Sequence, residues 1–155
     1  MRRSRLHGGM IIMKFESVLL EAEYTNIILT LLETPYNISS VTKLTFIAFC
    51  VKHENNMLSY RNRTKDFVDT FISNVSLKLT AHYEDIKIIF QVLKILQDSQ
   101  IIDVEKDEIK VVATIPSHTN ENDFLNFCSD KIPNPIVEIN KLDSKALIEE
   151  VIRYV

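Results

Sequence analysis

Glycine is absent after residue 9, and this absence restricts the fold more than any other feature of the sequence. The chain holds two glycines, Gly8 and Gly9. Glycine is the residue that most readily adopts left-handed backbone conformations in tight turns and lets a backbone approach a ligand closely. Its absence favours helices joined by polar loops. It also excludes the phosphate-binding loops GxxxxGK[ST] and GxGxxG from residues 10–155.

Size and composition indicate one folded, non-membrane domain. The 155 residues are 46% hydrophobic and 25% charged, and a chain of this length buries about 70% of its unfolded surface. Its apolar runs are shorter than the roughly 20 residues that span a bilayer. Cys50 and Cys128 lie far apart in apolar segments, which is typical of buried free thiols in a reducing compartment. We therefore expect a cytoplasmic protein.

The overall charge argues against nonspecific DNA binding. The net charge is −3, and it becomes −6 when residues 1–9, with Arg2, Arg3 and Arg5, are left out. An acidic domain repels the phosphate backbone.

The first fourteen residues differ from the rest. Three arginines precede a short apolar patch, Met10 to Met13, which is too short for a signal peptide and lacks a cleavage site. Residues 1–14 are either a basic arm or a mis-annotated start ahead of Met10 or Met13. Residues 15–155 are expected to form a single domain, with a core at 15–113 and a C-terminal extension at 114–155.

Apolar residues recur at helical spacing in four segments before residue 98. The first runs from Glu16 to Glu33 and ends before Pro35. Its apolar positions are Val18, Leu19, Ala22, Ile27, Ile28, Leu31 and Leu32. The others are 41–51, a segment capped by Thr64 and reaching Leu79, and 82–97. Segment 41–51 is apolar on nearly every face, so we expect it at the centre of the fold.

The pattern then changes to that of a β-hairpin. Ile101–Val104 and Ile109–Val112 are β-rich runs separated by Glu105–Glu108, as expected for two strands joined by a turn. Helices followed by a hairpin predict a winged-helix-like unit. The carboxylates of the turn, Glu105, Asp107 and Glu108, are expected at a solvated tip.

The C-terminal region is predicted to be broken by prolines. Pro116, Pro133 and Pro135 interrupt the chain around a short helix at 121–129, and a last amphipathic helix covers Ser144 to Tyr154. The predicted fold class is mainly α: a helical domain with a winged-helix-like helix plus β-hairpin unit and a C-terminal helix.

The sequence contains no pattern that is typical of catalysis or of cofactor binding. Its histidines are scattered and do not have the short ligand spacings of zinc sites; they are His7, His53, His82 and His118. GxSxG is absent, and the apolar surroundings of Cys50 disfavour a thiolate. We therefore expect a protein that is not an enzyme, with no catalytic residues, no metal and no cofactor.

Two segments are candidate docking surfaces for partner proteins, because aromatic and arginine residues often anchor interfaces. The first is a basic loop cluster whose alternative interpretation is a solvated loop balancing Asp66 and Asp69; it consists of Tyr60, Arg61, Arg63 and Lys65. The second lies on the C-terminal helix and consists of Ile148, Ile152 and Tyr154.

A candidate DNA-binding surface lies on the helix before the hairpin. Lys87 and Lys94 are seven residues apart and would face a groove if that helix entered it. Glu84, Asp85 and the acidic hairpin oppose this reading, because they repel phosphates.

The order of these features resembles the middle component of ABC-three-component systems, the small subunit of Lamassu-type anti-phage defence. Glu23–Ile28 is similar to the opening of that family, although the proline that commonly follows the asparagine is absent. The apolar segment 41–51, the polar stretch Asn55–Arg63 and the helix and hairpin at 85–112 are similar to later parts of the family. The resemblance covers roughly 15–112 and rests on hydrophobic patterns.

The resemblance implies an accessory subunit without chemistry of its own. Such a subunit docks onto an SMC/Rad50-like ATPase and helps to hold an effector, often a nuclease, in a regulated complex that contacts DNA. The competing hypothesis is a winged-helix DNA-binding transcriptional regulator.

Overall fold

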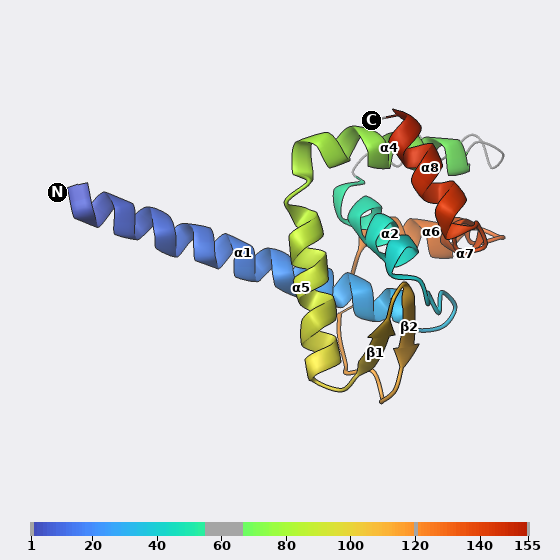
Figure 1. Ribbon diagram of the computed structural model, residues 1–155, viewed down its shortest axis with the longest axis horizontal. Helices are drawn as coiled ribbons and strands as arrows, with labels where there is room; N and C mark the ends of the chain where they lie inside the picture. The colour runs from blue at the N-terminus through green and yellow to red at the C-terminus, as the bar shows by residue number, and fades with distance from the viewer. Residues whose placement is uncertain (1, 55–66, 120, 155) are drawn as a thin grey trace.

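The computed structural model describes residues 2–54, 67–119 and 121–154, and it gives only the backbone course of residues 2–14, 67 and 154. The fold is mainly helical, with a helix-plus-hairpin unit and a C-terminal helix (Figure 1). The predicted fold class is therefore confirmed.

Helix α1 (Arg2–Leu32) is longer than the sequence pattern predicts. It begins fourteen residues before Glu16 and runs through residues 2–14, which were expected to be either a basic arm or a mis-annotated start. Figure 1 shows its N-terminal half extending away from the rest of the molecule, while its C-terminal half lies against α5 and α2. It ends before Pro35, as expected.

Helix α2 (Val41–His53) lies at the centre of the fold, as predicted. Ser40 is its N-cap, and the Ser40 hydroxyl accepts a hydrogen bond from the backbone N–H of Lys43 (3.2 Å). Such a cap satisfies one of the backbone donors at the start of a helix. The helix contacts α1, α4, α5 and α8. Its buried residues are Leu44, Thr45, Ile47, Ala48, Phe49, Cys50 and Val51.

Helices α4 (Phe67–His82) and α5 (Asp85–Asp98) follow, and α5 leads into the antiparallel strands β1 (Ile102–Glu105) and β2 (Glu108–Val111). Glu105 pairs with Glu108, so the turn is two residues tighter than predicted. The predicted cap residue Thr64 lies outside the described residues.

Non-glycine residues take the left-handed conformations that the turns require. Asn37 (φ 45°), Gln100 (φ 60°) and Lys106 (φ 56°) have positive φ angles. A left-handed conformation costs a residue with a Cβ atom roughly 1–2 kcal/mol. Because no glycine stands at these positions, the three residues carry local backbone strain in the loop after α1, before β1 and in the hairpin turn.

The hairpin turn is exposed, as predicted for a solvated tip, but it is also bound to the start of α2, which the sequence did not predict. The backbone N–H of Val41 donates to the carbonyl of Asp107 (2.8 Å), and that of Ile109 donates to the carbonyl of Ser39 (2.7 Å). The Asp107 carboxylate accepts from the Ser40 hydroxyl (2.6 Å) and from the N–H and hydroxyl of Thr42 (2.9 and 2.8 Å). Although partial burial acts to raise it, these hydrogen bonds lower the pKa of Asp107. Glu105, Asp107 and Glu108 are all exposed, as expected.

The C-terminal region packs onto the same core through helices α6 (Asp123–Ser129), α7 (Pro135–Asn140) and α8 (Ser144–Tyr154). Helix α8 has the predicted bounds. Pro135 does not break the chain: it stands in the first turn of α7, where its missing N–H leaves no bond unmade. The buried apolar residues of this region are Phe124, Leu125, Cys128, Ile136, Ile139, Leu147 and Val151.

Candidate functional site

The predicted loop cluster is outside the described part of the chain. Tyr60, Arg61, Arg63 and Lys65 fall within residues 55–66, so this docking surface stays a prediction.

Helix α8 turns its apolar side inward. Leu147 and Val151 are buried, and the helix packs on α4. The Ser76 hydroxyl of α4 donates to the Val151 carbonyl (3.0 Å). Of the predicted docking residues, Ile148 is half-buried, Ile152 is 65% exposed, and the side chain of Tyr154 is not described. The exposed apolar surface described on α8 is therefore small.

Helix α5 carries a mixed aromatic and basic surface, which we call the α5 face and define as Lys87, Phe90 and Lys94. All three are exposed, and Phe90 is 50% exposed. They lie at i, i+3 and i+7, which places them on one side of a helix. The opposite side is buried and consists of Ile89, Val92, Leu93 and Leu96. The lysines that the sequence singled out thus share one solvent-facing side.

Lys87 and Lys94 were singled out from the sequence, but Phe90 was not, because it stands in a helix with many other apolar residues. Around the helix axis, Phe90 lies about a third of a turn away from the mean direction of the buried residues, which are Ile89, Val92, Leu93 and Leu96. An aromatic residue displaced from the core stripe and set between two lysines is the signal that could have identified it.

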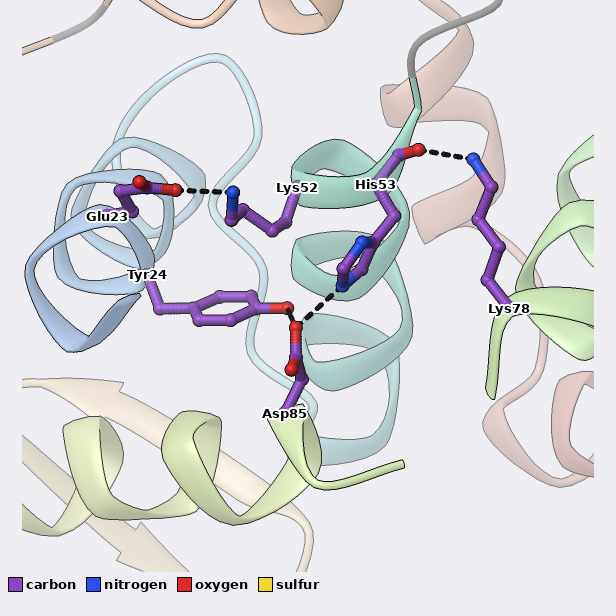
Figure 2. A network of polar contacts seen from close by, with 6 residues as sticks. All are labelled: Glu23, Tyr24, Lys52, His53, Lys78 and Asp85. Atoms are coloured by element: carbon purple, nitrogen blue, oxygen red, sulfur yellow. Dashed lines mark hydrogen bonds and ion pairs between the residues drawn. The ribbon is translucent and has the colours of Figure 1, made fainter. Parts of the chain in front are cut away.

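A buried polar network joins three helices at the centre of the molecule (Figure 2). Tyr24 of α1 donates from its hydroxyl to Oδ2 of Asp85, at the start of α5 (2.6 Å). Nε2 of His53, near the end of α2, lies 2.6 Å from the same oxygen. Tyr24 is fully buried and Asp85 is 8% exposed. One carboxylate oxygen therefore connects α1, α2 and α5.

Burial sets the protonation of this network. Burial, followed by the hydrogen bond to Asp85, raises the pKa of Tyr24. Burial also lowers the pKa of His53, although the bond to Asp85 opposes this, and the neighbouring His82 adds to the lowering. The His53 and His82 rings stack with centroids 4.3 Å apart. At neutral pH, Tyr24 and a neutral His53 can both donate to the Asp85 carboxylate.

Lysines fix the end of α2 around this network. Nζ of Lys78 donates to the carbonyl of His53, and Lys52 pairs with Glu23 of α1 at 2.5 Å (Figure 2). A cation near the C-terminus of a helix is favoured by the helix dipole. These contacts orient α2 against α1 and α4, so the network has the geometry of a structural junction.

A shallow hollow of about 290 Å³ lies beside the junction. It is lined by Glu16, Ser17, Leu20, Glu84, Asp85 and Ile88. Asp85 is almost completely buried and its Oδ2 already accepts from Tyr24, so the hollow offers mainly the two outer carboxylates, Glu16 and Glu84.

Over the described residues, no group of three or more His, Cys, Asp and Glu side chains is arranged to hold a metal ion.

Cys50 and Cys128 are buried, and burial raises the pKa of the Cys128 thiol to about 12. Nor does any helix in this part of the chain have the length and apolarity needed to cross a membrane.

Residues 15–22 of α1 expose apolar side chains. Val18, Leu19 and Ala22 were counted with Ile27 and Ile28 in one pattern of apolar residues at helical spacing. In the structure Ile27 and Ile28 are buried, whereas Val18 is 63% and Leu19 is 48% exposed, and Ala22 is exposed as well. Phe15 is 64% exposed. We call Phe15, Val18, Leu19 and Ala22 the α1 stripe.

Comparison of the chain with protein-family models, with curated proteins and with solved structures gave no match.

Proposed function

We propose that this protein is a non-catalytic accessory subunit of a bacterial anti-phage defence complex. It docks in the cytoplasm onto an SMC/Rad50-like ATPase and helps to hold an effector nuclease. The order of apolar helices and hairpin, which resembles the middle component of ABC-three-component systems, supports this proposal. The α5 face is the observation that carries it.

The α5 face suits a protein partner because it combines an aromatic anchor with positive charge. Phe90 is half-exposed between Lys87 and Lys94, and aromatic residues are enriched at the centres of protein interfaces. The other side of α5 packs in the core, and its first residue is held by Tyr24 and His53. A rigid helix thus presents the face, which favours docking on an acidic partner surface.

The test is co-expression of the tagged chain with the genes encoded beside it, followed by affinity purification and mass determination of the intact complex. Recovery of an SMC-like ATPase and an effector in fixed ratio supports the proposal. Recovery of the chain alone under gentle conditions contradicts it.

The docking surface is tested in the same experiment with matched variants. Phe90→Ala removes a half-exposed aromatic side chain, and Leu77→Ala removes a side chain that is 72% exposed on α4. We expect Phe90→Ala to reduce recovery of the ATPase at least about tenfold, since truncation of an interface anchor costs about 2 kcal/mol or more. Leu77→Ala should recover it fully. Equal recovery with both variants argues against the α5 face.

A second candidate function is DNA binding by a winged-helix-like unit, because Lys87 and Lys94 share the exposed side of the helix that precedes the hairpin. Glu105 and Glu108 are exposed on that hairpin and oppose it. Fluorescence anisotropy of a labelled duplex at increasing salt separates the two functions. DNA binding by this face predicts salt-dependent affinity that Lys87→Glu with Lys94→Glu abolishes. Absence of binding at low salt removes this candidate.

A further inference from the structure

Strand β2 has one edge that pairs with β1 and an outer edge that is only partly paired. The backbone N–H of Val112 donates to the carbonyl of Ile101 (2.9 Å), so these two residues form a hydrogen-bonded pair. Hydrogen-bonded and non-hydrogen-bonded pairs alternate along an antiparallel ladder. The next pair, Ile102 with Val111, is therefore non-hydrogen-bonded, and the backbone N–H and C=O of Val111 point away from β1.

The loop after α1 pairs with the outer edge of β2 and then leaves it (Figure 1). The N–H of Ile109 donates to the carbonyl of Ser39 (2.7 Å), and the same register would bring residue 37 opposite Val111. Asn37 has a positive φ angle of 45° instead, and its N–H is bonded within the turn that follows α1. Among the described residues, the N–H and C=O of Val111 consequently have no hydrogen-bond partner.

A hollow of about 670 Å³ lies along this unpaired part of the edge. Its buried apolar lining consists of Leu32, Ile38 and Ile109, and Val111, which also lines it, is 44% exposed. Exposed polar residues complete the lining; they are Thr34, Asn37, Ser39 and Thr114. An apolar lining with a few polar groups and a volume in this range are typical of binding sites.

The unpaired backbone groups determine the conformation of an occupant. A donor and an acceptor on one strand residue are satisfied together by the backbone of a second extended chain. A helix cannot do this along its length, because its own N–H and C=O groups are bonded to one another. The outer edge of β2 is therefore suited to an extended segment.

The lining of the hollow also determines the charge of an occupant. Among the described residues that line it, Glu33 alone is charged. The Glu33 side chain is 43% exposed, and Nε2 of His118 lies 3.6 Å from its carboxylate. A hollow that carries a carboxylate and no lysine or arginine favours a segment with a basic side chain.

We propose that the outer edge of β2 binds an extended, basic segment of a partner protein, which adds to the hairpin as a third strand. The segment pairs with Val111 through its backbone. It places an apolar side chain over Ile38 and Ile109 and directs a lysine or arginine toward Glu33. This inference goes beyond the proposed accessory function and does not depend on it.

The first experiment selects binders to the full-length chain from a phage-displayed library of random peptides of about nine residues, a length sufficient for a strand. The enriched peptides should alternate apolar residues with polar ones, include a lysine or arginine, and bind with a Kd of about 100 µM or tighter in calorimetry. Methylation of the peptide backbone nitrogens then tests the mode of binding. It should abolish binding only at every second residue, because alternate N–H groups face β2.

The second experiment measures the selected peptide on matched variants of the chain. Val111→Pro removes the outer N–H but no bond to β1, since Val111 belongs to a non-hydrogen-bonded pair, and it should weaken binding about tenfold. Val111→Ile keeps the N–H and an apolar β-branched side chain, so it should bind as wild type does. Glu33→Gln should weaken a basic peptide by up to about fivefold. Far-ultraviolet circular dichroism checks that each variant keeps its helices.

Three outcomes would overturn the proposal. One is a selection that enriches no peptide above a control without protein. Another is a peptide that binds Val111→Pro as tightly as wild type or, if that variant does not fold, one whose binding to wild type shows no alternation on methylation. The third is a wild-type dimer in native mass spectrometry that Val111→Pro disperses, because it would assign the edge to a second copy. These measurements use the chain alone, so their outcome is separate from that of the co-purification with an ATPase.

Discussion

The part of α1 whose side chains are described divides into an N-terminal half, residues 15–23, and a C-terminal half, residues 24–32, which are similar in apolar content and differ in what surrounds them. The C-terminal half buries Tyr24, Ile28 and Leu31 completely, against α2 and α5. The N-terminal half leaves Phe15 and Val18 almost two-thirds exposed. Helical spacing of apolar residues therefore shows that a side of a helix is suited to contact, but not whether the contact is made within the same chain.

The comparison extends to the polar residues of α1. Tyr24 and Glu23 make contacts with α5 and α2, through Asp85 and Lys52. Together with the buried apolar residues, they tie the C-terminal half to the body of the molecule. Substitutions in the two halves should consequently have very different effects on stability.

The largest difference is expected between Ile28→Ala and Val18→Ala. Ile28 is fully buried, so its truncation leaves a cavity and should lower the free energy of unfolding by about 2–5 kcal/mol. Val18→Ala should change it by less than about 0.5 kcal/mol. Urea denaturation measures both. Similar losses would show that the halves do not differ as described.

The next effect concerns Tyr24, which stands where the two halves meet. Tyr24→Phe removes a donor from the buried Asp85 carboxylate, and we expect a loss of about 1–3 kcal/mol in the free energy of unfolding. Tyr83→Phe is the matched control because Tyr83 is 66% exposed and should lose almost nothing. If Tyr24→Phe is as stable as wild type, the junction does not hold α1.

The junction should also respond to pH through His53. Because burial lowers the pKa of His53 in the folded state, the unfolded chain binds its proton first as the pH falls. The contribution of His53 to stability is therefore complete above the unfolded pKa of about 6.5 and declines as the pH falls from there toward the lowered pKa. Denaturation at pH 7.5 and 5.5 should show a smaller pH-dependent loss in His53→Gln than in wild type. An equal loss would contradict this assignment.

The smallest effect is expected for the ion pair at the border of the two halves. The side chains of Glu23 and Lys52 are 53% and 27% exposed, and water weakens such pairs to about 0–1 kcal/mol. Glu23→Gln should thus have a small effect on the melting temperature, and Glu16→Gln, in the exposed half, none. A large loss in Glu16→Gln would show that the projecting half contributes to the stability of the body.

The positions of most elements could be predicted because they depend on local sequence. The end of α1 before Pro35, the start of α2 at its Ser40 cap and the bounds of α8 follow from capping, proline and spacing rules. The lysines of the α5 face could also be placed on one side of their helix. These features require only the residues of a single element.

Features that join distant parts of the chain could not be predicted. Tyr24 meets Asp85 across 61 positions, and Asp107 meets Thr42 across 65. No spacing rule links residues so far apart, and Asp107 in particular has the same type of side chain as the solvated carboxylates of any turn. Its capping role depends on where the hairpin docks.

By itself, the sequence determined the helical class, the hairpin after α5 and the side of each helix that is apolar, because these follow from backbone preferences and from residues a few positions apart. The tertiary structure decided which apolar sides are covered. It buried the second half of α1 against α2 and α5 and left Phe15, Val18 and Leu19 exposed. The physical reason is that burial depends on where other elements pack, and packing is settled by the whole chain at once.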